Sequence, residues 1–135
     1  MAIGTTAFYT ALLALVLIVL SIRVIGVRRS RQISLGDGND ADLRGRIRAH
    51  GNFTEYTPMA LLLMAGVEGY GFDQIIVHGL GLALLAGRIS HAAAVSPVQQ
   101  IMPLRVAGMT LTLGVISASA LLVIVCGLAS LMTGN

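Results

Sequence analysis

Long apolar runs alternate with short polar segments along this chain, and the pattern predicts four helices that each cross a membrane. Residues 1–22 contain no charged side chain, and Ala11–Leu20 consists only of Leu, Val, Ile and Ala. A helix needs about 20 apolar residues to cross the hydrocarbon core of a bilayer. Spans are expected at about residues 3–23, 52–69, 74–95 and 104–132. The fold class expected for residues 1–135 is therefore a single all-α integral membrane domain, a bundle of four transmembrane helices.

Turn-forming residues and prolines mark the connections between these spans. Residues 24–50 are expected to form a long first connection, because residues 36–40 read Gly-Asp-Gly-Asn-Asp. Pro58 lies inside the second span, where the missing backbone donor predicts a kink near Thr54. Residues 96–103 form a short third connection that contains two prolines.

The charges predict how the spans are oriented. Seven of the nine arginines lie between Arg23 and Arg48, and the chain has no lysine. The hairpin tip at Glu68–Asp73 carries two acids and no base. Under the positive-inside rule the first connection is cytoplasmic and both termini lie on the other side. The basic residues follow the first apolar run, whereas a signal peptide carries them before it, so the first run is expected to be retained as a span.

Composition excludes several other classes of protein. Hydrophobic residues make up 56% of the chain and charged residues 11%, against about a quarter charged in soluble domains. The net charge of +3 does not indicate a nucleic-acid partner, because the arginines border apolar spans and form no solvated basic face. The single cysteine, Cys126, gives no intrachain disulfide and is expected to be a small buried side chain. The histidines have no carboxylate or cysteine at ligand spacing, so no metal site is expected.

The most polar segment enters the second span directly. Arg48, Asn52 and Glu55 stand at i, i+4 and i+7 and share a helix face. Such residues are costly at membrane depth and face the bundle interior. They predict either a groove for a small charged ligand, whose carboxylate the guanidinium could bind in a bidentate fork, or a structural clamp in which Glu55 pairs with Arg88 or Arg105.

The third and fourth spans carry further candidates. Arg88 and His91 stand at i, i+3 and either line the same pocket or serve structure, with Arg88 snorkelling and His91 hydrogen-bonded in the packing. Arg105 follows Pro103 at the start of the fourth span, where the helix dipole disfavours a cation. An anion such as a thiolate would offset this cost, and the alternative is a topology anchor. The candidates, all expected near the cytoplasmic ends of the helices, are Arg23, Arg48, Asn52, Glu55, Arg88, His91 and Arg105.

Three motifs in these segments resemble a known family. Arg48–Pro58 has the form R-A-H-x-N-x-x-E-x-x-P, Gly87–Val95 reads GRISHAAAV, and Met102–Arg105 reads MPLR. Together with the size, the four spans and the basic first connection, they resemble the MAPEG family, the membrane-associated proteins in eicosanoid and glutathione metabolism. The chain is most similar to the family's small bacterial branch.

The resemblance implies a homotrimer in the bacterial inner membrane, with glutathione as co-substrate bound between subunits near the cytoplasmic face. Arg105 would be the catalytic residue that holds the thiolate, and Glu55 would contact the glutathione amino group. The remaining positions implied to bind or support glutathione are Arg23, Arg48, Asn52, Arg88 and His91. The implied activity is that of a glutathione transferase or peroxidase, with lipophilic electrophiles entering from the bilayer.

Three departures from the family pattern narrow the activity. Gly51 and Val95 stand where other members have a glutathione-binding arginine and tyrosine, and Val106 stands where the prostaglandin synthase has a serine. Prostaglandin and leukotriene synthesis are therefore not expected. A non-catalytic membrane scaffold or regulator that still binds a small ligand is the alternative. A small multidrug-type exporter ranks last, because it relies on an acidic residue in the first span and residues 1–22 have none.

Overall fold

The computed structural model describes residues 4–96 and 98–133, and these form four long helices with short connections. The helices are α1 (Gly4–Arg31), α2 (Ala41–Gly69), α3 (Gln74–Val95) and α4 (Met102–Thr133). Within these described ranges no strand occurs. The prediction of an all-α bundle is confirmed.

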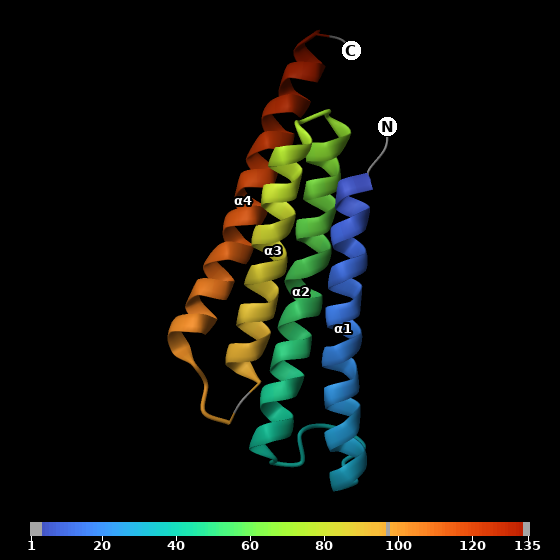
Figure 1. The fold of residues 1–135 in the computed structure, drawn as a ribbon, viewed down its shortest axis with the longest axis vertical. Helices are drawn as coiled ribbons and strands as arrows, with labels where there is room; N and C mark the ends of the chain where they lie inside the picture. Colours follow the sequence, from blue (N-terminus) through green and yellow to red (C-terminus); the bar gives the residue numbers. More distant parts are fainter. Residues whose placement is uncertain (1–3, 97, 134–135) are drawn as a thin grey trace.

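The helices run alternately up and down, so that α1 begins and α4 ends at the same end of the bundle (Figure 1). The opposite end carries the α1–α2 and α3–α4 connections, and we call it the basic end because all nine arginines lie in the helix halves that adjoin it. Helices α2 and α3 contact each other and both outer helices, whereas α1 and α4 do not touch. The bundle therefore has two faces, one formed by α1, α2 and α4 and the other by α1, α3 and α4.

Three of the helices in the described chain, α1, α3 and α4, are long and apolar enough to cross a membrane. The fourth, α2, is long enough but more polar, because it carries Asn52, Glu55 and Glu68. It packs against each of the other helices, which covers much of its polar surface. The chain is thus a multi-pass helical membrane protein, and which side its termini occupy stays a prediction.

The first connection is shorter than the expected residues 24–50, because α1 continues to Arg31 and α2 begins at Ala41. Asp40 caps α2 by accepting a hydrogen bond from the Leu43 amide at 3.0 Å, and it pairs with Arg31 at 3.4 Å. The Leu43 amide, followed by the Arg31 charge, lowers the pKa of Asp40 below its ordinary value. The turn between the helices uses left-handed backbone at Gly36, Gly38 and Asn39.

The α2–α3 hairpin is tied to the start of α1 by a buried carboxylate. Glu68 lies within α2 and accepts hydrogen bonds from the amides of Thr5 and Thr6 at 2.9 and 2.8 Å. The first amides of a helix have no partner within it, so Glu68 caps α1 from a neighbouring helix. Pro58, which predicted a kink near Thr54, does not break the helix, since α2 remains continuous from Ala41 to Gly69.

Glycines bring α3 and α4 into close contact next to the candidate site. A Cβ atom added to Gly108 would lie 2.6 Å from the His91 backbone nitrogen and 2.7 Å from the Gly87 carbonyl oxygen. No side chain fits at those distances, so the contact requires glycine. The close approach fixes the segment of α3 that carries Arg88 and His91 against α4.

Candidate functional site

A hollow of about 580 Å³ lies between α2 and α4 toward the basic end, with one side chain from α3 at its base. We call it the arginine pocket. It brings together Arg48, Asn52, His91 and Arg105 from among the seven predicted site residues. The complete lining is Arg48, Asn52, Tyr56, His91, Met102, Arg105, Val106, Met109, Thr110 and Leu113.

Three lining residues of α2, Arg48, Asn52 and Tyr56, repeat every four positions and so follow one strip of the helix surface. Glu55 lies outside the strip and is exposed. In the described part of the chain it forms no ion pair, so the predicted clamp between Glu55 and Arg88 or Arg105 is not formed. Tyr56, which is not among the predicted site residues, joins the pocket. The spacing of four from Asn52 was the signal for it.

Arg88 lies behind the pocket and does not line it. Its side chain is fully buried (0% exposed), so it does not snorkel to the surface. Nη2 donates to the Asn52 Oδ1 at 2.7 Å, Nη1 donates to the Thr112 Oγ1 at 3.4 Å, and the guanidinium carbon stands 5.6 Å from the Phe53 ring centroid. The bond fixes Asn52 through its oxygen, and among the described residues the amide N–H₂ has no partner, which leaves it able to donate to a ligand. Arg88 is therefore a positioning residue for Asn52.

His91 and Arg105 reach the pocket from α3 and α4. His91 is only 4% exposed, and its Nδ1 has no hydrogen-bond partner within the described residues. Arg105 lies in the first turn of α4, where Nη1 donates to the Gln100 Oε1 at 2.7 Å. The neutral amide satisfies part of the guanidinium, and no acid in the described ranges forms an ion pair with Arg105.

The pocket combines cationic and apolar lining residues. Arg48 and Arg105 line it, Arg88 lies close behind Asn52, and no Asp or Glu is among its lining residues. Met102, Val106, Met109 and Leu113 form the apolar wall along α4. The arrangement suits an anionic ligand beside a lipophilic one, and its volume falls within the range of small-molecule sites.

Arg23 lies away from the arginine pocket of its own chain. It belongs to α1, which does not touch α4. Instead it lines a separate groove of about 340 Å³ between α1 and α3, together with Leu20, Ile89 and Ala92. Its predicted contact with glutathione, like that of Glu55, would require a neighbouring copy of the chain.

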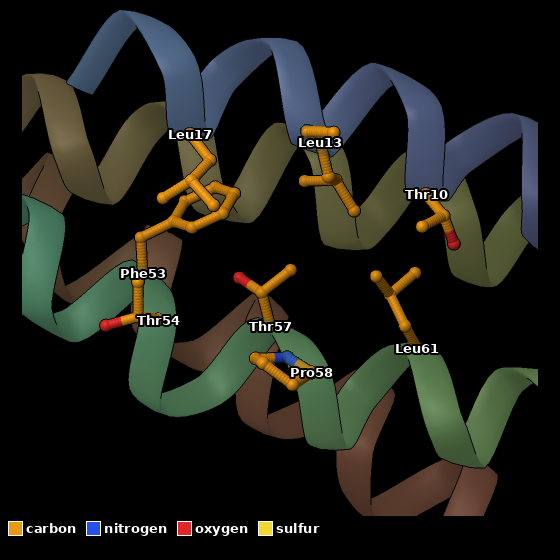
Figure 2. A pocket seen from close by; sticks show the side chains of 9 residues that line it. Thr10, Leu13, Leu17, Phe53, Thr54, Thr57, Pro58 and Leu61 are labelled. Atoms are coloured by element: carbon orange, nitrogen blue, oxygen red, sulfur yellow. The ribbon is translucent and has the colours of Figure 1, made fainter. Parts of the chain in front are cut away.

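A third hollow, an apolar cleft of about 230 Å³, separates α1 from α2 (Figure 2). Leu13 and Leu17 point from α1 toward Phe53, Thr57 and Leu61 of α2. The cleft has no charged lining residue and contains none of the predicted site residues. It does not suit a charged peptide.

Comparisons with known proteins agree with the motifs. The sequence profile of the MAPEG family matches residues 6–125. The chain is 41% identical over 86 residues to Inner membrane protein YecN of Escherichia coli strain K12, a match that covers 64% of this chain and 66% of that relative. The protein of the same name from Escherichia coli O6:H1 matches with the same identity and coverage. The chain thus spans about 66% of the length of these relatives.

Proposed function

Because this chain belongs to the MAPEG family, we propose that its arginine pocket binds glutathione and activates the thiol as a membrane-bound glutathione transferase or peroxidase. The observation that carries the proposal is the combination of two arginines, a free amide and an apolar wall in one pocket. Glutathione is anionic at neutral pH, and its lipophilic partner substrate would need an apolar surface beside it. The arginines and the apolar residues of the lining supply both environments.

Each polar residue has a role that follows from its position. Arg48 and Arg105 offer guanidinium donors to carboxylates, and the Asn52 amide, oriented by Arg88, donates to a carboxylate or peptide oxygen. Arg105 also lies near the start of α4, where unpaired amides and the helix dipole favour an anion. A nearby cation lowers the pKa of a thiol from its usual value of about 8.5. Arg105 is therefore the residue assigned to hold the sulfur as a thiolate.

Bound glutathione would supply the nucleophilic sulfur itself, so the chain needs no nucleophile of its own. The apolar wall formed by Val106, Met109 and Leu113 would place an electrophile from the bilayer beside that sulfur. His91 lines the pocket from α3, and its ring would contact the ligand there.

We extend the proposal to a homotrimer in the bacterial inner membrane. Arg23 and Glu55 lie outside the arginine pocket of their own chain, and a neighbouring copy is the route by which either could reach one. The relatives are named as inner membrane proteins, which supports this location.

A non-catalytic scaffold that binds glutathione without turnover is the second candidate. Val95 is buried in the core (3% exposed) and does not line the arginine pocket, so no tyrosine contact is available from that position. Gly51 faces open space, because a Cβ atom added to it would meet no atom within 4 Å, and an arginine there would add a further donor. A site with fewer hydrogen-bond donors can still bind glutathione and yet fail to activate its thiol.

The test is ultraviolet difference absorbance of the purified full-length protein with glutathione at neutral pH. We expect a saturable thiolate band in the wild type that is lost in Arg105→Ala. The matched control is Arg29→Ala, which removes an exposed arginine that lines none of the hollows described above. It should keep the band.

Glutathione binding measured by calorimetry separates the two candidates. Binding with a thiolate band supports the enzyme, and conjugation of a lipophilic electrophile would then be assayed. Binding without the band supports the scaffold. A folded wild-type protein that shows neither binding nor a band would refute both.

A further inference from the structure

The groove between α1 and α3 runs along the face of the bundle opposite the arginine pocket. Its walls are apolar, with Leu15 and Val19 from α1 facing Ile89 and Ala93 from α3. These side chains are exposed in the single chain, and both helices are long and apolar enough to span a membrane. From Leu15 to Arg23 the groove follows eight residues of helix, about 12 Å. It therefore extends from the basic end into the depth of the hydrocarbon.

Arg23 is the charged residue that lines this groove, and its guanidinium has no ion pair or hydrogen bond within the described residues. Two arginines nearer the end of α1 are engaged. Arg28 donates to the carbonyl oxygens of Ile33 and Ser34, and Arg31 pairs with Asp40. A half-buried cation at the mouth of an apolar groove lacks the partner that would offset its desolvation.

We propose that this groove binds an anionic phospholipid, whose phosphate contacts Arg23 and whose acyl chain lies between α1 and α3. Charge complementarity selects the headgroup, since Arg23 has no partner among the described residues and no acid lines the groove. The apolar walls select a hydrocarbon chain. Basic pockets between transmembrane helices are established sites for anionic lipid headgroups. A soluble anion would satisfy Arg23 and leave the groove below it empty.

This site is separate from the arginine pocket and does not depend on glutathione chemistry. It gives Arg23 a role within its own chain, whereas a contact with glutathione would need a neighbouring copy. The two roles make different predictions for the same substitution.

The experiment titrates the purified full-length protein in detergent with phosphatidylglycerol or with phosphatidylcholine of the same acyl chains. Native mass spectrometry counts the lipids bound per subunit and gives the dissociation constant of the first one. One basic residue near a membrane surface contributes about 1 kcal/mol, so we expect phosphatidylglycerol to bind about fivefold more tightly. Arg23→Gln should lower its affinity to that of phosphatidylcholine, and Arg23→Lys should preserve the preference.

Two further variants locate the lipid. Arg29→Gln removes an exposed arginine from the same helix outside the groove, and it should keep the preference. Ala93→Phe fills the groove from an exposed position of α3 and should weaken both lipids. Circular dichroism and the oligomer mass in the same spectra identify any variant that has not folded.

Several results would overturn the proposal. These are equal affinity for the two lipids in the wild type, equal loss in Arg23→Gln and Arg29→Gln, and unchanged lipid binding in Ala93→Phe. Displacement of the lipid by inorganic phosphate would reassign Arg23 to a soluble anion. If Arg23→Gln weakened glutathione and left phosphatidylglycerol unaffected, Arg23 would belong to the glutathione site of a neighbouring copy.

Discussion

Substitutions of Asn52 and Arg88 should have non-additive effects on the free energy of unfolding. The reason is that the Asn52 amide oxygen accepts the shorter side-chain hydrogen bond of the buried Arg88 guanidinium. The bond is 2.7 Å long, and the fully buried Arg88 makes one other side-chain bond to a described residue, the longer one to Thr112 at 3.4 Å. Its Nε already lacks a partner within the described residues. Asn52→Ala would remove the short bond and leave the cation largely unsatisfied in the bundle.

The expected magnitude follows from the charge on the donor. A hydrogen bond to a charged group contributes about 1.5–3 kcal/mol, so Asn52→Ala should lower the free energy of unfolding by about that amount. Arg88→Met removes the buried charge and keeps an apolar side chain of similar length. Replacing a buried charge by an apolar residue is often close to neutral, so this variant should lose less than Asn52→Ala. In the double variant the decrease in the free energy of unfolding should be smaller than the sum of the two single decreases by at least about 1 kcal/mol.

The assay is unfolding in mixed micelles, with helix content followed by circular dichroism as the fraction of denaturing detergent rises. The same variants are titrated with glutathione, because Arg88 orients the Asn52 amide. Both single variants should weaken glutathione, and the double variant should be little worse than Asn52→Ala. Losses that add to within about 0.5 kcal/mol would show that the two side chains act independently, and would refute the positioning role of Arg88.

Two further predictions concern the caps at opposite ends of the bundle. Glu68→Ala should expose the Thr5 and Thr6 amides to faster hydrogen exchange and lower the free energy of unfolding by about 1–3 kcal/mol per unpaired buried amide. Glu68→Gln should lower it less, and unchanged exchange of these amides in Glu68→Ala would exclude a capping role. Because the folded state lowers the pKa of Asp40, its stabilisation of α2 should be full above the unfolded value of about 3.9 and be lost as pH falls through the lower folded value. A pH titration of the Leu43 amide resonance would detect the loss of the cap. If the same pH-dependent change persisted in Asp40→Asn, the Asp40 carboxylate would not be its cause.

The four helices could be predicted from the sequence because apolar runs of sufficient length have few alternatives in a bilayer. The residues that end those runs were harder to place. Residues 24–31 include three arginines and so were assigned to the connection, yet no proline interrupts them, and α1 continues to Arg31. Helix ends depend on local caps such as Asp40, whereas span ends depend on hydropathy.

The membership of the arginine pocket was only partly predictable. Arg48, Asn52, His91 and Arg105 converge as expected, because residues at one depth on packed helices lie close together. Rotation about each helix axis is set by packing, which the sequence does not display. It turns Glu55 outward, buries Arg88 behind Asn52 and brings Tyr56 into the pocket. Cys126, expected to be buried, is half-buried for the same reason.

The sequence pattern offered two interpretations of the polar face of α2, a ligand groove or a structural clamp through Glu55. That clamp is not formed, but Asn52 combines a structural bond with a place in the arginine pocket. Its oxygen satisfies Arg88 inside the bundle, while its nitrogen remains available at the arginine pocket. The bond that offsets the cost of burying Arg88 is thus the bond that orients a ligand donor. This explains how α2 tolerates more polarity than the other spans. Its polar groups are partly satisfied by the bundle itself, and the Gly87–Gly108 contact holds α3 close enough for Arg88 to reach Asn52 and Thr112.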